Sequence, residues 1–140
     1  MGVQARRRPG LRRDEGGAVV VEFAIVLPVL LAILIAVTEL ASYFWTRNTL
    51  KFAAEEAART AMINTKASPA EVKATALAKL NTVASLDPGR LTVTAAVDPY
   101  GAVTFMAVTA QYAWPAKGIT GLFPFDLGPA VGEARMPMVQ

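Results

Sequence analysis

The sequence contains no cysteine and no histidine. The first absence excludes a disulfide framework and a thiolate metal site, and the second excludes an imidazole general base and every histidine-dependent catalytic triad. The carboxylates Asp98, Asp126 and Glu133 are scattered over predicted turns and a strand, where a solvated surface role is expected. We therefore expect no enzyme activity, cofactor, metal or small-molecule substrate, and a hydrolase that uses carboxylates alone is the one enzymatic alternative.

Helix-breaking residues are also missing over a long stretch, because no glycine or proline stands between Val29 and Ser68. Upstream, residues 18–38 contain a single ionisable side chain, and at ~1.5 Å per helical residue they reach across the ~30 Å hydrocarbon core of a bilayer. This pattern predicts a transmembrane helix over residues 18–38 that continues as a helix over residues 39–64. Pro28 removes a backbone hydrogen bond and predicts a kink or a loosened turn near Ala24.

Charge is concentrated before the apolar run. Residues 1–17 carry five arginines and two carboxylates, which account for the whole net charge of +3. Arginines directly before an apolar helix favour retention of that end in the cytoplasm, so we interpret them as a topology signal rather than a nucleic-acid site. Residues from Glu39 onward are then outside. The topology residues are Arg6, Arg7, Arg8, Arg12 and Arg13.

A cleavable secretory signal is the main alternative for this region. The apolar core of such a signal spans ~7–15 residues and ends at a small-residue cleavage site. The run in this chain is longer, and the segment TELASYFWTR at its end contains no Ala-x-Ala sequence. A membrane anchor is therefore the better interpretation.

Glu22 is the ionisable side chain inside the run. A charge toward the centre of a bilayer costs roughly 2.5 kcal/mol or more and is usually paired or functional, although a carboxyl near a helix end can also stay hydrated or protonated at the interface. Its position relative to Gly17 is informative. Glu22 is the fifth residue after Gly17, and Phe23 is the sixth.

The basic leader, the glycine and the apolar helix with this spacing resemble the signal of Flp-type pilins, and specifically the TadE-like pseudopilins of tight-adherence (Tad) pilus systems. The segments VEFAIVLPVLL, TEL and AAEEAARTAM are also typical of that family. The resemblance implies that a prepilin-type membrane peptidase cuts after Gly17, leaving Ala18 as the new N-terminus. It also implies that Glu22 and Phe23 form the recognition and assembly pair, although the major Flp pilins usually have tyrosine at the second position.

The same resemblance implies the partners: the lipid bilayer, the peptidase, other Tad/Flp pilins and the proteins of the assembly platform. A physical reason for the assembly pair is independent of the family. Cleavage would create an α-ammonium at Ala18 within the membrane boundary, and the Glu22 carboxylate of one subunit could neutralise that ammonium on its neighbour.

The predicted helix beyond the membrane has two notable features. Aromatic residues Tyr43 and Trp45, with Glu39, Ser42 and Arg47 around them, are expected at the outer membrane boundary as an interfacial belt. Farther along, small residues at spacings of three and four form a stripe that packs either on the protein's own sheet, which we favour, or on a neighbouring subunit's helix. The helix-packing residues are Ala54, Ala57, Ala58 and Ala61.

The remaining chain predicts a short helix and a small sheet. Ser68, Pro69 and Glu71 form a capping box that starts a helix ending before the Asp87-Pro88-Gly89 turn. Alternating residues then predict strands over 91–97 and 102–114, joined by a type I turn at 98–101, and a third strand over 130–138. The apolar residues of the loop 115–129 either tuck under the sheet or form an exposed contact patch.

The sequence thus predicts an α+β chain: a long N-terminal transmembrane helix continuing into an amphipathic helix, a second short helix and an antiparallel sheet of about three strands. The expected divisions are a cleaved leader (1–17), a membrane span (18–38), an outer helix (39–64) and a small α+β domain (65–140). We expect a single-pass inner-membrane protein with its N-terminus inside that acts as a minor pseudopilin. The alternative is a permanently anchored envelope protein whose outer domain binds a partner.

Overall fold

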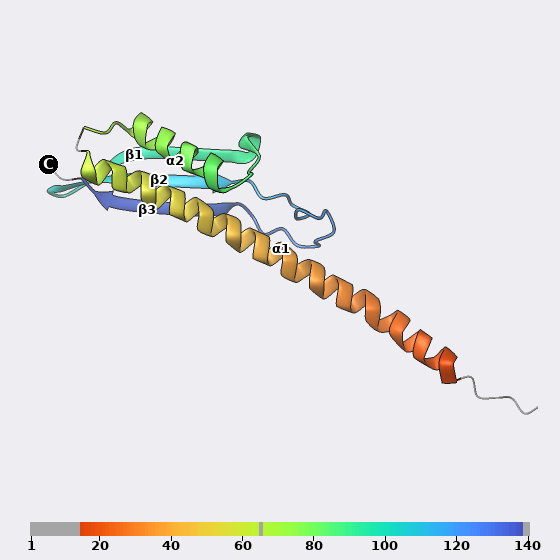
Figure 1. Cartoon of the computed structure of the whole chain (residues 1–140). Helices are drawn as coiled ribbons and strands as arrows, with labels where there is room; N and C mark the ends of the chain where they lie inside the picture. The colour runs from red at the N-terminus through yellow and green to blue at the C-terminus, as the bar shows by residue number, and fades with distance from the viewer. Residues whose placement is uncertain (1–14, 65, 139–140) are drawn as a thin grey trace, which may run out of the picture. The chain divides into compact units, whose positions relative to one another are not determined.

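The computed structural model describes residues 15–64 and 66–138 and confirms the α+β class (Figure 1). The chain divides into two compact units, which meet in the sequence between Leu34 and Ile35. The elements in order are α1 (Glu15–Ile63), α2 (Pro69–Val83), the 3-10 turn η1 (Pro88–Arg90), β1 (Leu91–Tyr100), β2 (Val103–Tyr112) and β3 (Ala130–Pro137).

Helix α1 begins earlier than the sequence predicts. It starts at Glu15, so Gly16 and Gly17 are helical, whereas the sequence predicts a helix from residue 18 onward. A helix nucleated by the apolar run extends readily by a few residues. Pro28 lies inside α1, and the residues around Ala24 remain α-helical.

The apolar part of α1 exposes its side chains on all sides. Val20 and Ile25 are each 68% exposed, and the other large apolar residues up to Leu34 are exposed to a lesser degree, except Leu27, which is half-buried. Within the described part of the chain, α1 is the one helix long and apolar enough to cross a membrane. An apolar helix without a protein partner is what a lipid-facing segment requires.

Local signals correctly predict the start of α2. The Ser68 side chain accepts a hydrogen bond from the Glu71 N–H (3.3 Å), and the Glu71 carboxylate accepts one from the Ser68 N–H (2.8 Å). Pro69 occupies the first turn, where its missing N–H is of no consequence. The capping box is therefore confirmed.

The sheet is antiparallel with the order β1-β2-β3. The turn between β1 and β2 differs from the prediction, because Asp98 and Pro99 belong to β1 and pair with Phe105 and Thr104. The chain reverses instead at Gly101, whose φ of +61° suits glycine. Proline is tolerated here because β1 is an edge strand.

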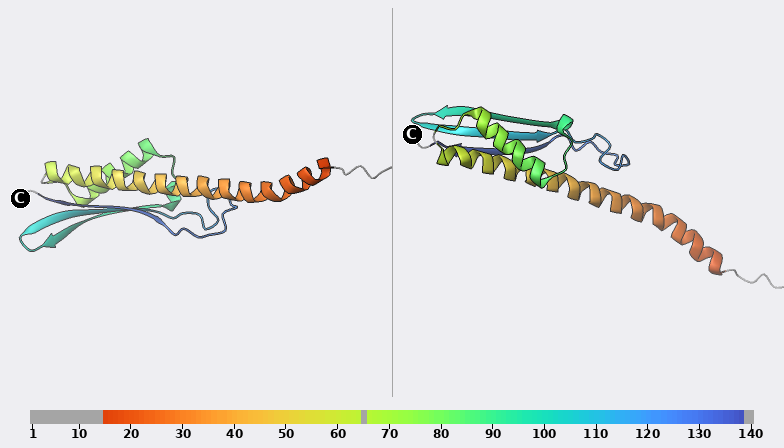
Figure 2. Two further views of the ribbon diagram at one scale, coloured as in Figure 1. Left: turned by 90° about the horizontal axis from the view of Figure 1, so that it is seen from below. Right: turned by 45° about the horizontal axis from the view of Figure 1, so that its top comes forward.

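We call the unit that begins at Ile35 the outer unit, after its predicted place outside the membrane. Its part of α1 and the whole of α2 cover the same face of the sheet (Figure 2). Alternate residues of β2 point toward them and are buried, as the period of two requires. The α1 alanines pack in one core with α2 and these strand residues. Fully buried members with large side chains are Leu50, Val72, Leu80, Met106 and Val108.

Gly132 marks the closest approach of the sheet to α1. A Cβ atom built at this position in β3 would overlap backbone atoms of Leu50 and Lys51. A glycine inside a strand often permits such a close approach of another backbone. Gly132 in the predicted third strand was therefore a sequence signal for this contact, and the prediction did not use it. Small residues on the helix and a missing side chain on the strand together let the two backbones come close.

We predict that Gly132→Ala destabilises the outer unit by about 3 kcal/mol, because helix backbone cannot move aside as a flexible side chain would. The measurement is the thermal unfolding midpoint of the full chain in detergent, followed by tryptophan fluorescence, in which the buried Trp114 should change most on unfolding. Gly89→Ala is the matched control, since its added Cβ would meet only the Asp87 side chain, at 3.3 Å. Equal midpoints for the two variants would show that α1 and β3 are not tightly packed.

Candidate functional site

The residues predicted to direct processing lie in the first turns of α1. Gly17 and Ala18 are helical and exposed, and the next turn presents Glu22 and Phe23, the latter 61% exposed. No described residue forms a hydrogen bond or ion pair with the Glu22 carboxylate. The five topology arginines lie outside the described residues, so their role stays a prediction.

The alanine stripe, unlike the exposed residues at the start of α1, lies in the core. Ala54, Ala57, Ala58 and Ala61 are all 0% exposed and belong to the core formed with α2 and the sheet. Their side chains leave no free surface for a neighbouring subunit. Of the two partners considered for the stripe, the structure places the protein's own core against it.

A buried carboxylate, Glu39, is a site residue that sequence analysis missed. It is 1% exposed and accepts hydrogen bonds from the N–H groups of Ile119 (2.9 Å) and Thr120 (2.6 Å). A Cβ at Gly118 would lie within 2.5–2.7 Å of the carboxyl group. Gly118 also has a φ of +69°, so the loop needs glycine here for both reasons. We call this contact of Glu39 with residues 118–120 the Glu39 clasp.

The clasp favours the ionised carboxylate. Burial raises the pKa of Glu39, but hydrogen bonds from the backbone and side chain of Thr120 and from the backbone of Ile119 lower it by more. The net pKa therefore lies below the ordinary value for glutamate. Hydrogen bonds to a charged acceptor are stronger than neutral ones, which allows a buried charge in the absence of a cation.

Tyr43 provides a second attachment for the same loop. Its hydroxyl donates to the Pro129 carbonyl (3.2 Å), and its ring meets Trp114 edge-to-face with centroids 5.4 Å apart. These contacts make Tyr43 part of the folded unit, and its place in an interfacial belt stays a prediction. Phe44 and Trp45 remain 53% and 69% exposed.

The apolar residues of the loop 115–129 are partly buried and partly exposed, so both alternatives drawn from the sequence apply. Phe123 is 5% exposed and packs into the unit, while Ile119, Leu122 and Phe125 are 63–70% exposed. Phe125 contacts Phe123 edge-to-face, with centroids 5.6 Å apart. One part of the loop is thus tucked in, and the other part presents a contact surface.

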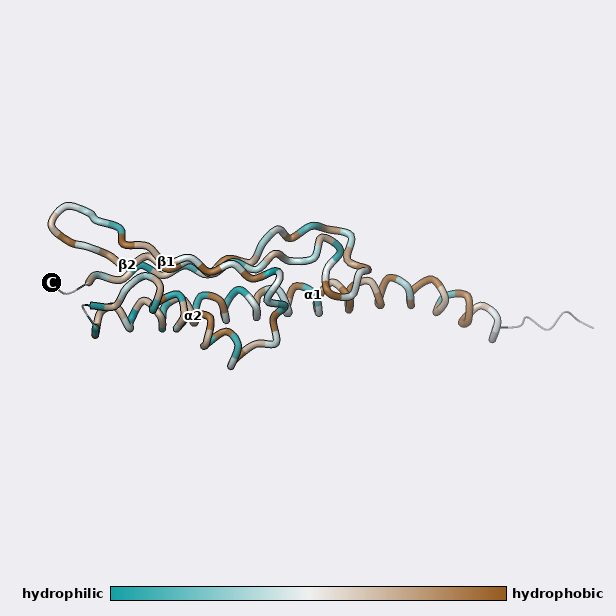
Figure 3. The backbone as a smooth tube through the Cα atoms, turned by 90° about the horizontal axis from the view of Figure 1, so that it is seen from above, coloured by the Kyte–Doolittle hydropathy of each residue, from teal (hydrophilic) through white to brown (hydrophobic). Residues whose placement is uncertain are grey.

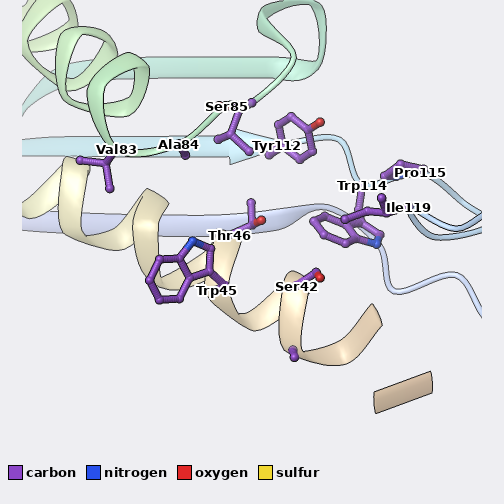
Figure 4. A pocket seen from close by; sticks show the side chains of 12 residues that line it. Ser42, Trp45, Thr46, Val83, Ala84, Ser85, Tyr112, Trp114, Pro115 and Ile119 are labelled. Carbon is purple, nitrogen blue, oxygen red and sulfur yellow. The ribbon is translucent and has the colours of Figure 1, made fainter. Parts of the chain in front are cut away.

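A cavity of about 720 Å³ lies beside the clasp, between α1, the segment that follows α2, and the end of β2 (Figure 4). Trp45, Tyr112 and Trp114 contribute rings to its wall, and no charged side chain lines it. The Trp114 indole N–H is buried and has no hydrogen-bond partner among the described residues. Those residues also contain no group of three or more acidic side chains that could hold a metal ion. The cavity offers packing space rather than acid–base chemistry.

Comparison with known proteins gives one match. Residues 17–59 match the family model described as TadE-like protein, which confirms the resemblance drawn from the motif. The match covers most of α1 and leaves α2 and the sheet outside it. No curated protein and no solved structure matches this chain.

We predict that Glu39→Gln loosens the loop and destabilises the outer unit by about 2 kcal/mol, because the amide replaces one acceptor by a donor that faces an N–H group. The stabilisation in the unchanged protein should persist above the unfolded-state pKa of about 4.3 and be lost as the pH falls through the lower folded-state pKa. Unfolding midpoints of the full chain, measured from neutral pH downward, check both statements. Glu55→Gln, a half-buried position on the same helix whose carboxylate makes only a partly exposed ion pair with Lys51 (3.8 Å), should change stability and its acid profile far less. Identical acid profiles for Glu39→Gln and the unchanged protein would contradict the clasp.

Proposed function

We propose that this chain, whose residues 17–59 match the TadE-like family, is a minor pseudopilin that helps to assemble a Tad/Flp-type pilus. The family match and the single apolar helix found among the described residues indicate a single-pass membrane protein associated with a Tad pilus. The observation that carries the finer proposal is the spacing of Gly17, Glu22 and Phe23 at the start of that helix.

Membrane insertion is the first step of the proposed mechanism. The arginines keep the N-terminus on the cytoplasmic side of the inner membrane, and residues 18–38 span the bilayer. The unit that follows from Ile35 folds outside, where its helices and sheet form a core without disulfides. A prepilin-type peptidase then removes the leader after Gly17.

Assembly uses the charges left by that cleavage. The new ammonium at Ala18 and the carboxylate of Glu22 are each costly in the membrane, and pairing them between neighbouring subunits offsets both costs. The Glu22 carboxylate is exposed on α1 and has no partner within the described chain. It is therefore available to a neighbour's N-terminus.

The surface of α1 available for lateral packing is the part that the protein's own core does not cover. The alanines of the outer helix are buried against the protein's own sheet and α2. The exposed apolar side chains of α1 upstream of Ile35 remain for contact with other pilin helices. The outer unit then distinguishes this subunit from a small major pilin and supplies contacts to the assembly platform.

We predict that the protein recovered from membranes of its native host begins at Ala18, and that Gly17→Leu abolishes this N-terminus. Gly16→Leu is the matched control, because only Gly17 places Glu22 fifth after the cut. Intact mass and N-terminal sequencing measure the outcome. A chain that keeps Arg6 to Arg13 in every variant would contradict processing and favour a permanently anchored envelope protein.

We also predict that Glu22→Gln is cleaved normally but is recovered with neighbouring pilins at least about tenfold less, because the Ala18 ammonium loses its counter-charge. The measurement is the amount of tagged full chain that co-purifies with sheared pili or with membrane assembly complexes. Glu55→Gln, which changes a carboxylate of α1 that pairs with Lys51 and lies beyond the predicted membrane run, should show normal recovery. Normal recovery of Glu22→Gln would remove the proposed charge pair.

A further inference from the structure

Three large apolar side chains crowd the surface of one loop. Ile119, Leu122 and Phe125 are 63%, 70% and 67% exposed, and all lie within the segment 115–129 that joins β2 to β3. Figure 3 shows apolar parts of this loop next to α1. Single exposed apolar residues need no explanation, but a cluster of them marks a surface that something covers.

The position of the loop along α1 is given by the Glu39 clasp. Glu39 binds the N–H groups of Ile119 and Thr120, and it is the residue directly after the predicted membrane run 18–38. Ile35 and Ala36 lie four and three residues before Glu39, therefore on the same helix face, and both are half-buried. The loop thus lies beside the last turn of the run that crosses the bilayer.

The surrounding residues have the chemistry of a membrane interface. Phe44 and Trp45 are exposed on α1 shortly after Glu39, and aromatic rings of this kind gather at the level of lipid headgroups. Lys117 is exposed in the loop beside the three apolar residues, where an ammonium can meet lipid phosphates. Apolar tips flanked by a cation and aromatic rings suit the boundary between headgroups and acyl chains better than water.

We propose that Ile119, Leu122 and Phe125 insert into the outer leaflet of the bilayer that α1 crosses, so that the loop is a second membrane contact of this protein. The clasp holds the loop at the depth where insertion is possible, and the Tyr43 hydrogen bond to Pro129 holds its far end. The inference rests on residues 18–38 spanning the membrane, and it is independent of leader cleavage and pilus assembly.

The absence of cysteine makes a direct test simple, because a single introduced cysteine carries the only label. Leu122→Cys is labelled with a nitroxide in the full chain, which is reconstituted into nanodiscs of phosphatidylethanolamine and phosphatidylglycerol. Tyr100→Cys is the matched control: it is 72% exposed against 70% for Leu122, and it lies at the β1–β2 turn, at the opposite end of the sheet (Figure 1). Phe125→Cys repeats the test at an independent position of the loop.

We expect the ratio of collisions with oxygen, which partitions into lipid, to collisions with a water-soluble nickel complex to be several-fold higher at positions 122 and 125 than at position 100. Equal ratios at all three positions would overturn the proposal, since the loop would then be in water. Low access of both reagents at positions 122 and 125 would also overturn it, because protein, such as a second copy of the chain, would then cover the loop.

Discussion

The close contact between α1 and the sheet is the constraint on which the outer unit depends. Alanines on the helix and Gly132 on β3 bring the two backbones together, so neither can rotate or slide without a clash. This contact, at Leu50 and Lys51, determines which face of α1 is buried. About three helical turns upstream the same face carries Glu39, which therefore points toward the loop and not toward solvent.

Two carboxylates of α1 show how the same group serves different purposes. Glu39 is buried, and its charge is satisfied by backbone N–H groups from a loop eighty residues away in the chain. Glu22 is exposed in an apolar stretch and has no counterpart in the described part of the chain. A charge satisfied internally stabilises the folded unit, whereas one left unsatisfied in a membrane environment favours association with another molecule. The proposed pairing with a neighbour's N-terminus follows from this difference.

The division of surfaces is consistent with that interpretation. The alanine stripe, which could have packed against the helix of another subunit, is buried in the core of the outer unit. The large apolar residues near the start of α1 are exposed. Self-contained packing at one end and open apolar surface at the other suit a protein that folds alone and then assembles through its membrane segment. The exposed side chains of the loop 115–129 add a third surface, in the segment that contacts Glu39 of α1.

Local interactions were readable from the sequence. The continuation of α1 to Ile63 follows from the absence of glycine and proline between Val29 and Ser68, the start of α2 from the capping box, and the sheet from the change to a period of two. Each depends on residues near one another in the chain. The spacing of Gly17 and Glu22 is equally local, and it carried the family resemblance that the match to residues 17–59 confirms. Only the tertiary structure decided that Glu39 and Tyr43 hold a distant loop, that Gly132 admits the helix backbone, and that the alanine stripe is filled from within. These are contacts between segments far apart in sequence, and a local pattern does not specify which segments meet.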